Sequence, residues 1–213
     1  CRLASGKVIT MITYYTPLHK SIWNESVGYT KRAIRHYSSM VGEYPYNVAQ
    51  VVQGPQSFGG GMEYPTITVI SPMNNKADLD QTIAHEVGHN WFYGILGTNE
   101  RVYPWMDEGI NSYFEDKYSA SRYGEADKYQ QIAFESLAAE KIDQPIATAA
   151  EQFSELNYNL VAYYKTAEWF RYLEAQLGKD VLANAIKEYY RRWQFRHPQP
   201  DDFKKVLEDV SGK

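Results

Sequence analysis

Two histidines and a glutamate that lie close together in the sequence could bind and use a metal ion. His85, Glu86 and His89 belong to the pentad HEVGH. Residues four apart lie one turn apart on the same face of an α-helix, about 6 Å along its axis, so both imidazoles can contact one ion. Glu86 is rotated by about 100° from His85, which leaves its carboxylate beside the pair. Glu86 is therefore a candidate base for a water molecule bound to the metal.

The surroundings of the pentad favour a metal site over its two alternatives, a chance match and a structural pair of histidines. The pentad is flanked by apolar residues, and buried polar groups need partners. A catalytic zinc takes three protein ligands and leaves one position for water. The next predicted helix opens with Asp107 and Glu108 and offers Glu108 as the third ligand. We expect one zinc ion per chain, held by His85, His89 and Glu108, although cobalt or manganese could occupy such a site.

The spacing around the pentad resembles that of the gluzincin peptidases, specifically the M1 aminopeptidase family. The family pattern is HExxH, eighteen residues and a ligand glutamate, and residues 90–107 separate His89 from Glu108. The run Asn90-Trp91-Phe92 is similar to the aromatic run of the family, and Trp105 to Gly109 match its W-x-x-E-G. The resemblance implies a thermolysin-like zinc peptidase domain.

Four residues upstream of the pentad resemble the exopeptidase motif of the family, G-x-M-E-N. They are Gly60, Gly61, Met62 and Glu63, followed by Tyr64 where the family commonly has Asn. In the family this strand lies along the substrate, and its glutamate binds the free amino terminus through a charge-assisted hydrogen bond, which is stronger than a neutral one. The alternative is a glycine turn followed by a solvated strand edge. The resemblance implies that Glu63 restricts cleavage to the first peptide bond.

A tyrosine further along the chain is a candidate for stabilising the transition state. Tyr163-Tyr164-Lys165-Thr166 is similar to the Y-x-K-G of the family, with Thr166 in place of Gly. The resemblance implies that Tyr163 donates its hydroxyl to the developing oxyanion, and Tyr164 is the alternative if it points inward. Hydrogen-bond acceptors must also orient the two imidazoles. The candidates, chosen by proximity in the sequence alone, are Asp107, Asn111 and Glu115.

The elements that must position these residues change character along the chain. Segments rich in β-branched and aromatic residues predict strands at 7–15, 47–53 and 62–71. Apolar residues at three- and four-residue steps predict helices at 22–41, 78–95, 107–123, 125–140, 156–177, 180–194 and 200–211. This segregation favours an α+β fold, with a small mixed N-terminal sheet packed on a mainly helical part, over a doubly wound fold. We expect one catalytic domain, 1–213, with a β-rich part, 1–77, and a helical part, 78–213.

The composition excludes several classes of partner. The 213 residues are 44% hydrophobic and 23% charged, with a formal net charge of −4. No stretch approaches the 18 or more apolar residues of a membrane helix, and no basic cluster fits nucleic acid. We therefore expect no membrane span and no nucleic-acid partner. Cys1 is the only cysteine, which excludes an internal disulfide and a cysteine-based zinc site.

The ends of the chain are typical of a piece of a larger protein. It begins at Cys1 without an initiator methionine and stops one turn after an amphipathic stretch. In the family that it resembles, a β-rich domain precedes this region and a helical one often follows, so we expect it to pack against N- and C-terminal domains outside this sequence. The aromatic C-terminal region is then either core or part of a docking face. The sequence does not determine the cellular compartment. We expect a soluble domain in the cytoplasm or outside it, and Cys1 is also compatible with a bacterial lipoprotein.

Together these features predict a zinc-dependent aminopeptidase that hydrolyses the first peptide bond of peptides with a free N-terminus. One alternative is a thermolysin-like zinc endopeptidase, which shares the metal site but needs no free amine. Another is a non-catalytic peptide-binding relative, although Glu86 and Tyr163, which such a protein would be free to lose, are both present. The preferred N-terminal residue cannot be predicted, because several elements line the pocket that would bind it.

Overall fold

The computed structural model describes residues 1–124 and 129–212 and divides into two compact units, Cys1–Gly94 and Ile95–Lys213. The border between the units follows the pentad, so the helix that carries His85 belongs to the unit with the sheet. The change from strands to helices predicted between 77 and 78 lies earlier in the chain. That all of 1–213 is one catalytic domain stays a prediction.

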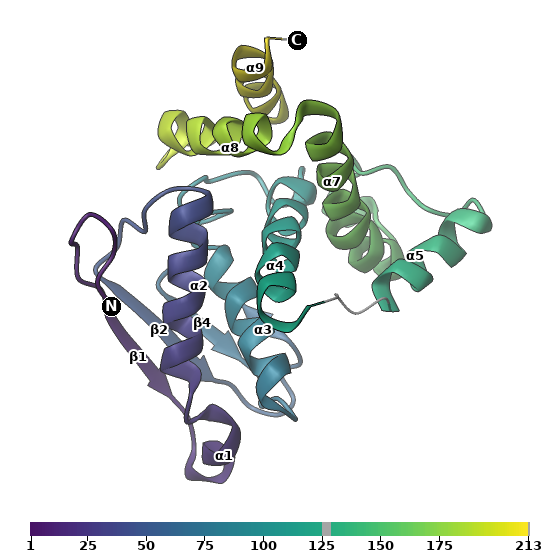
Figure 1. The fold of residues 1–213 in the computed structure, drawn as a ribbon. Coiled ribbons are helices and arrows are strands. Elements are labelled where there is room, and N and C mark those ends of the chain that lie inside the picture. Colours follow the sequence, from purple (N-terminus) through teal and green to yellow (C-terminus); the bar gives the residue numbers. More distant parts are fainter. Residues whose placement is uncertain (125–128, 213) are drawn as a thin grey trace. The chain divides into compact units, whose positions relative to one another are not determined.

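The first unit contains a four-stranded mixed sheet (Figure 1), with the strand order β1-β2-β4-β3. The strands are β1 Thr10–Tyr14, β2 Val48–Gln53, β3 Gly61–Met62 and β4 Ile67–Ile70. β1, β2 and β4 run parallel, with Thr10 opposite Val48 and Gln50 opposite Ile67, whereas β3 runs antiparallel to β4. The short β3, which carries part of the predicted substrate motif, is therefore the edge strand of this sheet.

The prediction of a single strand over 62–71 was wrong. The segment forms the end of β3, a turn and β4, because Pro65 has no N–H to continue a ladder and Thr66 has a φ of 67°, in the left-handed region. Gly61 pairs with Ile70 and Met62 with Val69 across the resulting hairpin. The turn sends the chain back along itself, so Glu63 lies at the bend and not in mid-strand.

Three helices and a short 3₁₀ turn complete the first unit. They are η1 Pro17–His19, α1 Lys20–Trp23, α2 Ser26–Met40 and α3 Lys76–Gly88. α2 and α3 lie side by side over one face of the sheet (Figure 1). Trp23, Tyr37 and Trp91 are fully buried between these elements, and the rings of Tyr37 and Trp91 stack with centroids 5.3 Å apart. These three aromatic side chains therefore form part of the core of the unit.

Two helix predictions in this unit need correction. The single helix expected at 22–41 is divided into α1 and α2 at Asn24 and Glu25. The helix expected at 78–95 begins at Lys76 and ends at Gly88, where the side-chain amide of Asn90 donates to the carbonyl oxygen of Val87 at 2.9 Å. A side-chain donor of this kind competes with the backbone for the last carbonyls of a helix. His89 is consequently the C-terminal cap of α3.

The second unit is helical. Its elements are η2 Pro104–Met106, α4 Glu108–Tyr123, α5 Tyr129–Ala139, η3 Ala150–Gln152, α6 Glu155–Asn157, η4 Tyr158–Lys165, α7 Thr166–Leu177, α8 Lys179–Trp193 and α9 Pro200–Ser211. α4 packs on η4 and α7, and α8 packs on α9. The first residues of the helix predicted at 125–140 lie outside the described residues, and the helix expected at 156–177 contains the π-helical stretch η4.

The aromatic C-terminal region of the second unit contributes to its core. Phe170, Tyr189 and Phe203 are buried and in ring contact, whereas the Tyr172 and Phe195 side chains are 64% and 59% exposed. With its small mixed sheet followed by helices, the chain has the predicted α+β fold. Within the described ranges, no helix is both long enough and apolar enough to cross a bilayer.

Candidate metal centre

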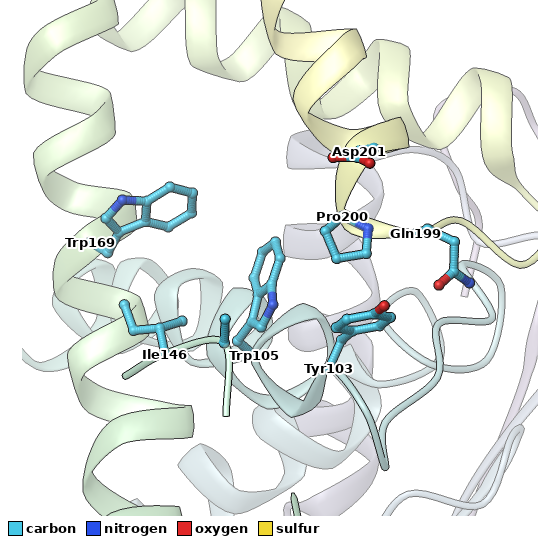
Figure 2. Close-up of a pocket in the computed structure, with 8 residues that line it drawn as sticks. Tyr103, Trp105, Ile146, Trp169, Gln199, Pro200 and Asp201 are labelled. Atoms are coloured by element: carbon cyan, nitrogen blue, oxygen red, sulfur yellow. The ribbon is translucent and has the colours of Figure 1, made fainter. Parts of the chain in front are cut away.

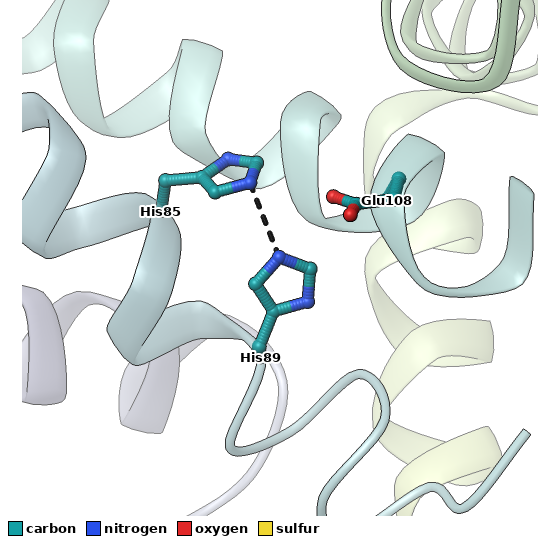
Figure 3. Close-up of side chains that lie close together, drawn as sticks. All are labelled: His85, His89 and Glu108. Carbon is teal, nitrogen blue, oxygen red and sulfur yellow. Dashed lines mark hydrogen bonds between the residues drawn. The ribbon is translucent and has the colours of Figure 1, made fainter. Parts of the chain in front are cut away.

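His85, in the last turn of α3, faces His89, the C-terminal cap of the same helix. Their Nε2 atoms are 3.1 Å apart, marked by the dashed line in Figure 3, and their rings are inclined by 79°. Zinc bonds of 2.0–2.1 Å in tetrahedral geometry hold two ligand nitrogens about 3.3 Å apart. The two imidazoles are therefore spaced as ligands of one metal ion, and His89, 1% exposed, is shielded from bulk water.

Glu86 lies on α3 between these histidines and against the edge strand β3. Its side chain is buried, and a Cβ atom added at Gly61 would lie 2.1 Å from Glu86 Oε1. Such a contact is far inside van der Waals distance, so a residue with a side chain at position 61 would require β3 or Glu86 to move. The backbone of the predicted substrate strand thus directly adjoins the predicted base.

The rest of the substrate motif is placed by the hairpin. The carbonyl oxygen of Gly60 accepts a hydrogen bond from the Ser71 N–H at 2.9 Å, and Gly60 has a φ of 80°. The carbonyl oxygen of Met62 accepts from the Thr68 hydroxyl at 2.9 Å. Glu63 follows, and its carboxylate, the Glu86 carboxylate and a ring nitrogen of His89 all lie within 4.8 Å of one another. The first unit therefore contains four of the predicted site residues: the metal ligands His85 and His89, the base Glu86 and the amine-binding Glu63.

Glu108 and Tyr163 lie together in the second unit. Glu108, also labelled in Figure 3, is the first residue of α4, and Tyr163 lies in η4, which packs on α4. Burial, followed by the charge of Glu108 and a hydrogen bond with it, raises the pKa of the Tyr163 hydroxyl above its ordinary value. The hydroxyl therefore stays protonated and able to donate a hydrogen bond at neutral pH.

The alternative tyrosine is engaged elsewhere. The Tyr164 hydroxyl donates to Glu168 Oε1 at 2.8 Å, one helical turn away. Because the Tyr163 hydroxyl interacts with Glu108, a predicted metal ligand, whereas the Tyr164 hydroxyl binds Glu168, these contacts favour Tyr163 for the predicted role. Asp107 and Asn111, the candidate acceptors, are buried at the start of α4, and Glu115 is half-buried on the same helix; their role toward the imidazoles stays a prediction.

Gly109, which follows Glu108, is held tightly against the helix that contains Tyr163. A Cβ atom at position 109 would lie 2.2 Å from Thr166 Cγ2 and 2.6 Å from the carbonyl oxygen of Ala162, and Thr166 is fully buried. We expect Gly109→Ala to lower the free energy of unfolding by about 1–3 kcal/mol, because the extra methyl group overpacks this contact. Urea denaturation measures the change.

A double-mutant cycle tests the origin of that loss. Because Thr166→Gly removes the atoms nearest to the added methyl group, Gly109→Ala should cost less in the Thr166→Gly background than in the wild type. Equal costs in both backgrounds, or a Gly109→Ala variant as stable as the wild type, would refute the contact.

The second unit also contains an apolar cavity of about 700 Å³ (Figure 2). Its lining consists of Tyr103, Trp105, Ile146, Ala147, Trp169, Gln199, Pro200 and Asp201. The indole rings of Trp105 and Trp169 meet nearly at right angles, with centroids 5.9 Å apart. Trp105 belongs to the W-x-x-E-G match, but neither Glu108 nor Tyr163 is among these lining residues. The cavity is therefore lined by residues other than Glu108 and Tyr163, the predicted catalytic groups of this unit.

One residue next to the predicted metal ligands, Asn90, was not predicted from the sequence to have a role of its own. Asn90 was noted only as part of an aromatic run, yet its buried side chain joins the end of α3 to the turn after Glu63. Asn directly after the second histidine was the available signal, because a buried amide needs several hydrogen-bond partners.

The profile of the peptidase family M1 domain matches residues 25–213, and the chain belongs to this family. Aminopeptidase M1-B of Oryza sativa subsp. japonica is 24% identical over 80% of this chain, and a leukotriene A-4 hydrolase homolog of Botryotinia fuckeliana is 27% identical over 84%. The chain covers 22% and 30% of the lengths of these two relatives. It therefore spans less than a third of either protein.

Solved structures support the fold. The M1 zinc metallopeptidase from Deinococcus radiodurans aligns over 86% of this chain and 40% of its own, with a TM-score of 0.69 and 20% identity. Yeast LTA4 hydrolase in complex with bestatin aligns over 94% of this chain and 35% of its own, with a TM-score of 0.74 and 18% identity. At these identities the likeness establishes a shared fold.

Proposed function

We propose that the chain is the catalytic domain of a zinc-dependent aminopeptidase that removes N-terminal residues from peptides. The observation that carries this proposal is the gathering of Glu63 and Glu86 with His89 within 4.8 Å. A metal hydrolase needs one carboxylate as base, and a second carboxylate at the edge strand suits an α-ammonium group. Membership of peptidase family M1 supports the same reaction class.

The proposed ligands of one zinc ion are His85, His89 and Glu108. The Nε2 separation of 3.1 Å suits two zinc ligands, and the eighteen residues at 90–107 give the third ligand the spacing of the family. Two imidazoles and one carboxylate with a remaining open position are the donor set of a catalytic zinc. When bound, zinc polarises the scissile carbonyl and lowers the pKa of the attacking water.

Three side chains carry the remaining chemistry. Glu86 takes a proton from the attacking water and returns it to the leaving amine, as a general base and then a general acid. Tyr163 donates its hydroxyl to the oxyanion that forms on the scissile carbonyl. Glu63 accepts hydrogen bonds from the α-ammonium, while Gly60 to Met62 offer backbone groups along the substrate. Only the first peptide bond is then presented for attack.

A comparison of free and blocked substrates tests the reaction class. We expect hydrolysis of aminoacyl substrates and of a short peptide, with kcat/KM at least about tenfold lower for the N-acetylated peptide, because it cannot form the charge-assisted bond to Glu63. Equal rates on both peptides would indicate an endopeptidase. Peptide binding without hydrolysis by the zinc-loaded protein would indicate a non-catalytic relative.

Removal of the metal gives a second test. A chelator should remove one zinc ion per chain together with all peptidase activity, and added Zn²⁺ should restore both. His89→Ala should bind zinc at least about tenfold more weakly, because it deletes one of the three ligands. His36→Ala, on α2, is the matched control and should keep full zinc content in metal analysis. A His89→Ala variant with unchanged zinc affinity would reject this ligand set.

We further propose that the domain works within a longer protein and packs against additional domains. The chain covers only 21–24% of the first four relatives and 35–42% of the aligned structures, which supports this. A mutant of the Deinococcus radiodurans enzyme has been crystallised with a Tyr-Ser-Ala substrate, and we propose peptides as the substrates here too. Assays of both the 213-residue chain and the longer protein would show whether the additional domains are required for activity.

A further inference from the structure

We infer that Asn90 is a positioning residue that holds the amine-binding carboxylate of Glu63 in register with the end of α3. Asn90 directly follows His89, and its side chain is 3% exposed. The hydrogen bonds of its side chain go to Tyr44, Thr66 and Val87, not to a group proposed to react, so it would act through the turn that follows Glu63. The effect of Asn90 on the use of the free amine rests on the proposed function. The structural link between Asn90 and the turn at Thr66 does not.

The hydrogen bonds of Asn90 fix the orientation of its amide. Its Oδ1 accepts from the backbone N–H of Thr66 at 2.8 Å, and its Nδ2 donates to the carbonyl oxygen of Val87 at 2.9 Å. A flipped amide would place a donor against the Thr66 N–H and an acceptor against the Val87 carbonyl. A single side chain thus links the turn of the β3–β4 hairpin to the last turn of α3.

A third contact is weaker and provides a control. The Tyr44 hydroxyl lies 3.3 Å from Asn90 Oδ1 but 3.0 Å from the carbonyl oxygen of Val48. A hydroxyl has one hydrogen to donate. The shorter distance favours Val48, so removing the Tyr44 hydroxyl should leave the main link between Asn90 and Thr66 in place.

The turn that Asn90 holds is unfavourable on its own. Thr66 is β-branched and has a φ of 67°, a conformation that such residues rarely adopt and that surrounding contacts must maintain. Its N–H is bound by Asn90, and its carbonyl oxygen accepts from the Gln50 N–H of β2 at 2.8 Å. Loss of the Asn90 contact leaves the Thr66 backbone held by the Gln50 bond and by the turn's own bond from the Ile67 N–H to the Tyr64 carbonyl oxygen at 3.0 Å.

Displacement of this turn would act first on Glu63, which is separated from Thr66 by only two residues. Glu63 lies within 4.8 Å of Glu86 and His89, so a small shift changes where the substrate amine can bind relative to the base. Misplacement of a bound group by about 1 Å can cost up to about a hundredfold in rate. Asn90 therefore influences the use of the free amine without contributing a reacting atom.

The test compares Asn90→Ala with the wild type, both loaded with zinc, on an aminoacyl substrate and on its des-amino analogue. We expect kcat/KM for the aminoacyl substrate to fall by about 10–100-fold, mainly through KM, with a smaller change for the analogue. A variant that had merely lost stability would lose both activities in proportion. A proportional loss, or an unchanged KM, would overturn the inference.

Three further variants sharpen the test. Tyr44→Phe is the control and should behave like the wild type. Thr66→Gly in the Asn90→Ala background should restore part of the loss, because glycine adopts a positive φ without strain. Should Asn90→Ala fail to fold, Asn90→Leu replaces it, since leucine keeps a similar volume without an acceptor; an Asn90→Leu protein with wild-type selectivity would overturn the inference equally.

Amide exchange separates this inference from the proposed function. The Thr66 N–H should be protected in the wild type and should exchange at least about tenfold faster in Asn90→Ala. Unchanged Thr66 exchange would overturn the inference whatever the kinetics. A wild type that does not prefer free amines, with Thr66 protection still dependent on Asn90, would instead reject the aminopeptidase proposal and leave the structural link standing.

Discussion

Glu86→Gln is expected to abolish peptide hydrolysis while leaving one zinc ion bound. Glutamine has the size of glutamate and fits against Gly61, where a Cβ atom would already lie 2.1 Å from Glu86 Oε1, but it cannot take a proton from water. General-base catalysis contributes about 10²–10⁴-fold, so kcat should fall by at least that factor. Steady-state kinetics and metal analysis on the same preparation measure both quantities.

The control for this prediction is Glu140→Gln, an exposed glutamate just after α5. It makes the same chemical change and should retain wild-type kcat and zinc content. If Glu86→Gln kept high activity with zinc bound, the base would have to lie elsewhere. Glu63, whose carboxylate lies within 4.8 Å of that of Glu86, would then be the first residue to examine.

The local part of the candidate site could be predicted from the sequence. The i, i+4 spacing of His85 and His89 fixes a shared helix face, and the observed Nε2 atoms are 3.1 Å apart. The contact of Gly61 with Glu86, in contrast, was not predicted. The spacing of the two histidines could be predicted because it depends only on residues near in sequence at the end of one helix.

The features that escaped prediction depend on contacts between distant residues. Apolar residues on both sides of Pro65 suggested one strand, but a left-handed Thr66 held by Asn90 splits it into a hairpin. The end of α3 at Gly88 likewise depends on the Asn90 side chain, which no periodicity reveals. The hydrophobic pattern predicts which faces are buried, but it does not predict which polar side chain will hydrogen-bond to a turn.

The π-helical stretch that contains Tyr163 could not be predicted either, because the hydrophobic pattern does not distinguish it from an α-helix. Its apolar residues have helical spacing, so an α-helix over 156–177 was expected. The Thr166 N–H instead bonds back to the Val161 carbonyl oxygen, five residues earlier, and the Thr166 hydroxyl donates to the same oxygen at 2.9 Å. Such bulges are frequent at functional sites, because they redirect the side chains of one turn. Here that turn contains Tyr163.

Tyr163→Phe is expected to lower kcat by about 10²–10³-fold with little change in KM. The hydroxyl is proposed to act on the oxyanion, which exists only after attack, so its removal should affect the transition state and not substrate binding. Because burial and Glu108 keep the pKa of this hydroxyl above its ordinary value, the loss should be the same across neutral pH. Zinc content and the melting temperature show whether the site is otherwise intact.

Tyr164→Phe is the matched control, since it removes the same atom from the adjacent residue. The Tyr164 hydroxyl binds Glu168, so its loss should cost stability of about 1 kcal/mol but leave kcat close to that of the wild type. The opposite result, with Tyr164→Phe inactive and Tyr163→Phe active, would exchange the two roles. Full activity in both variants would remove tyrosine from the mechanism and leave the oxyanion to groups outside η4.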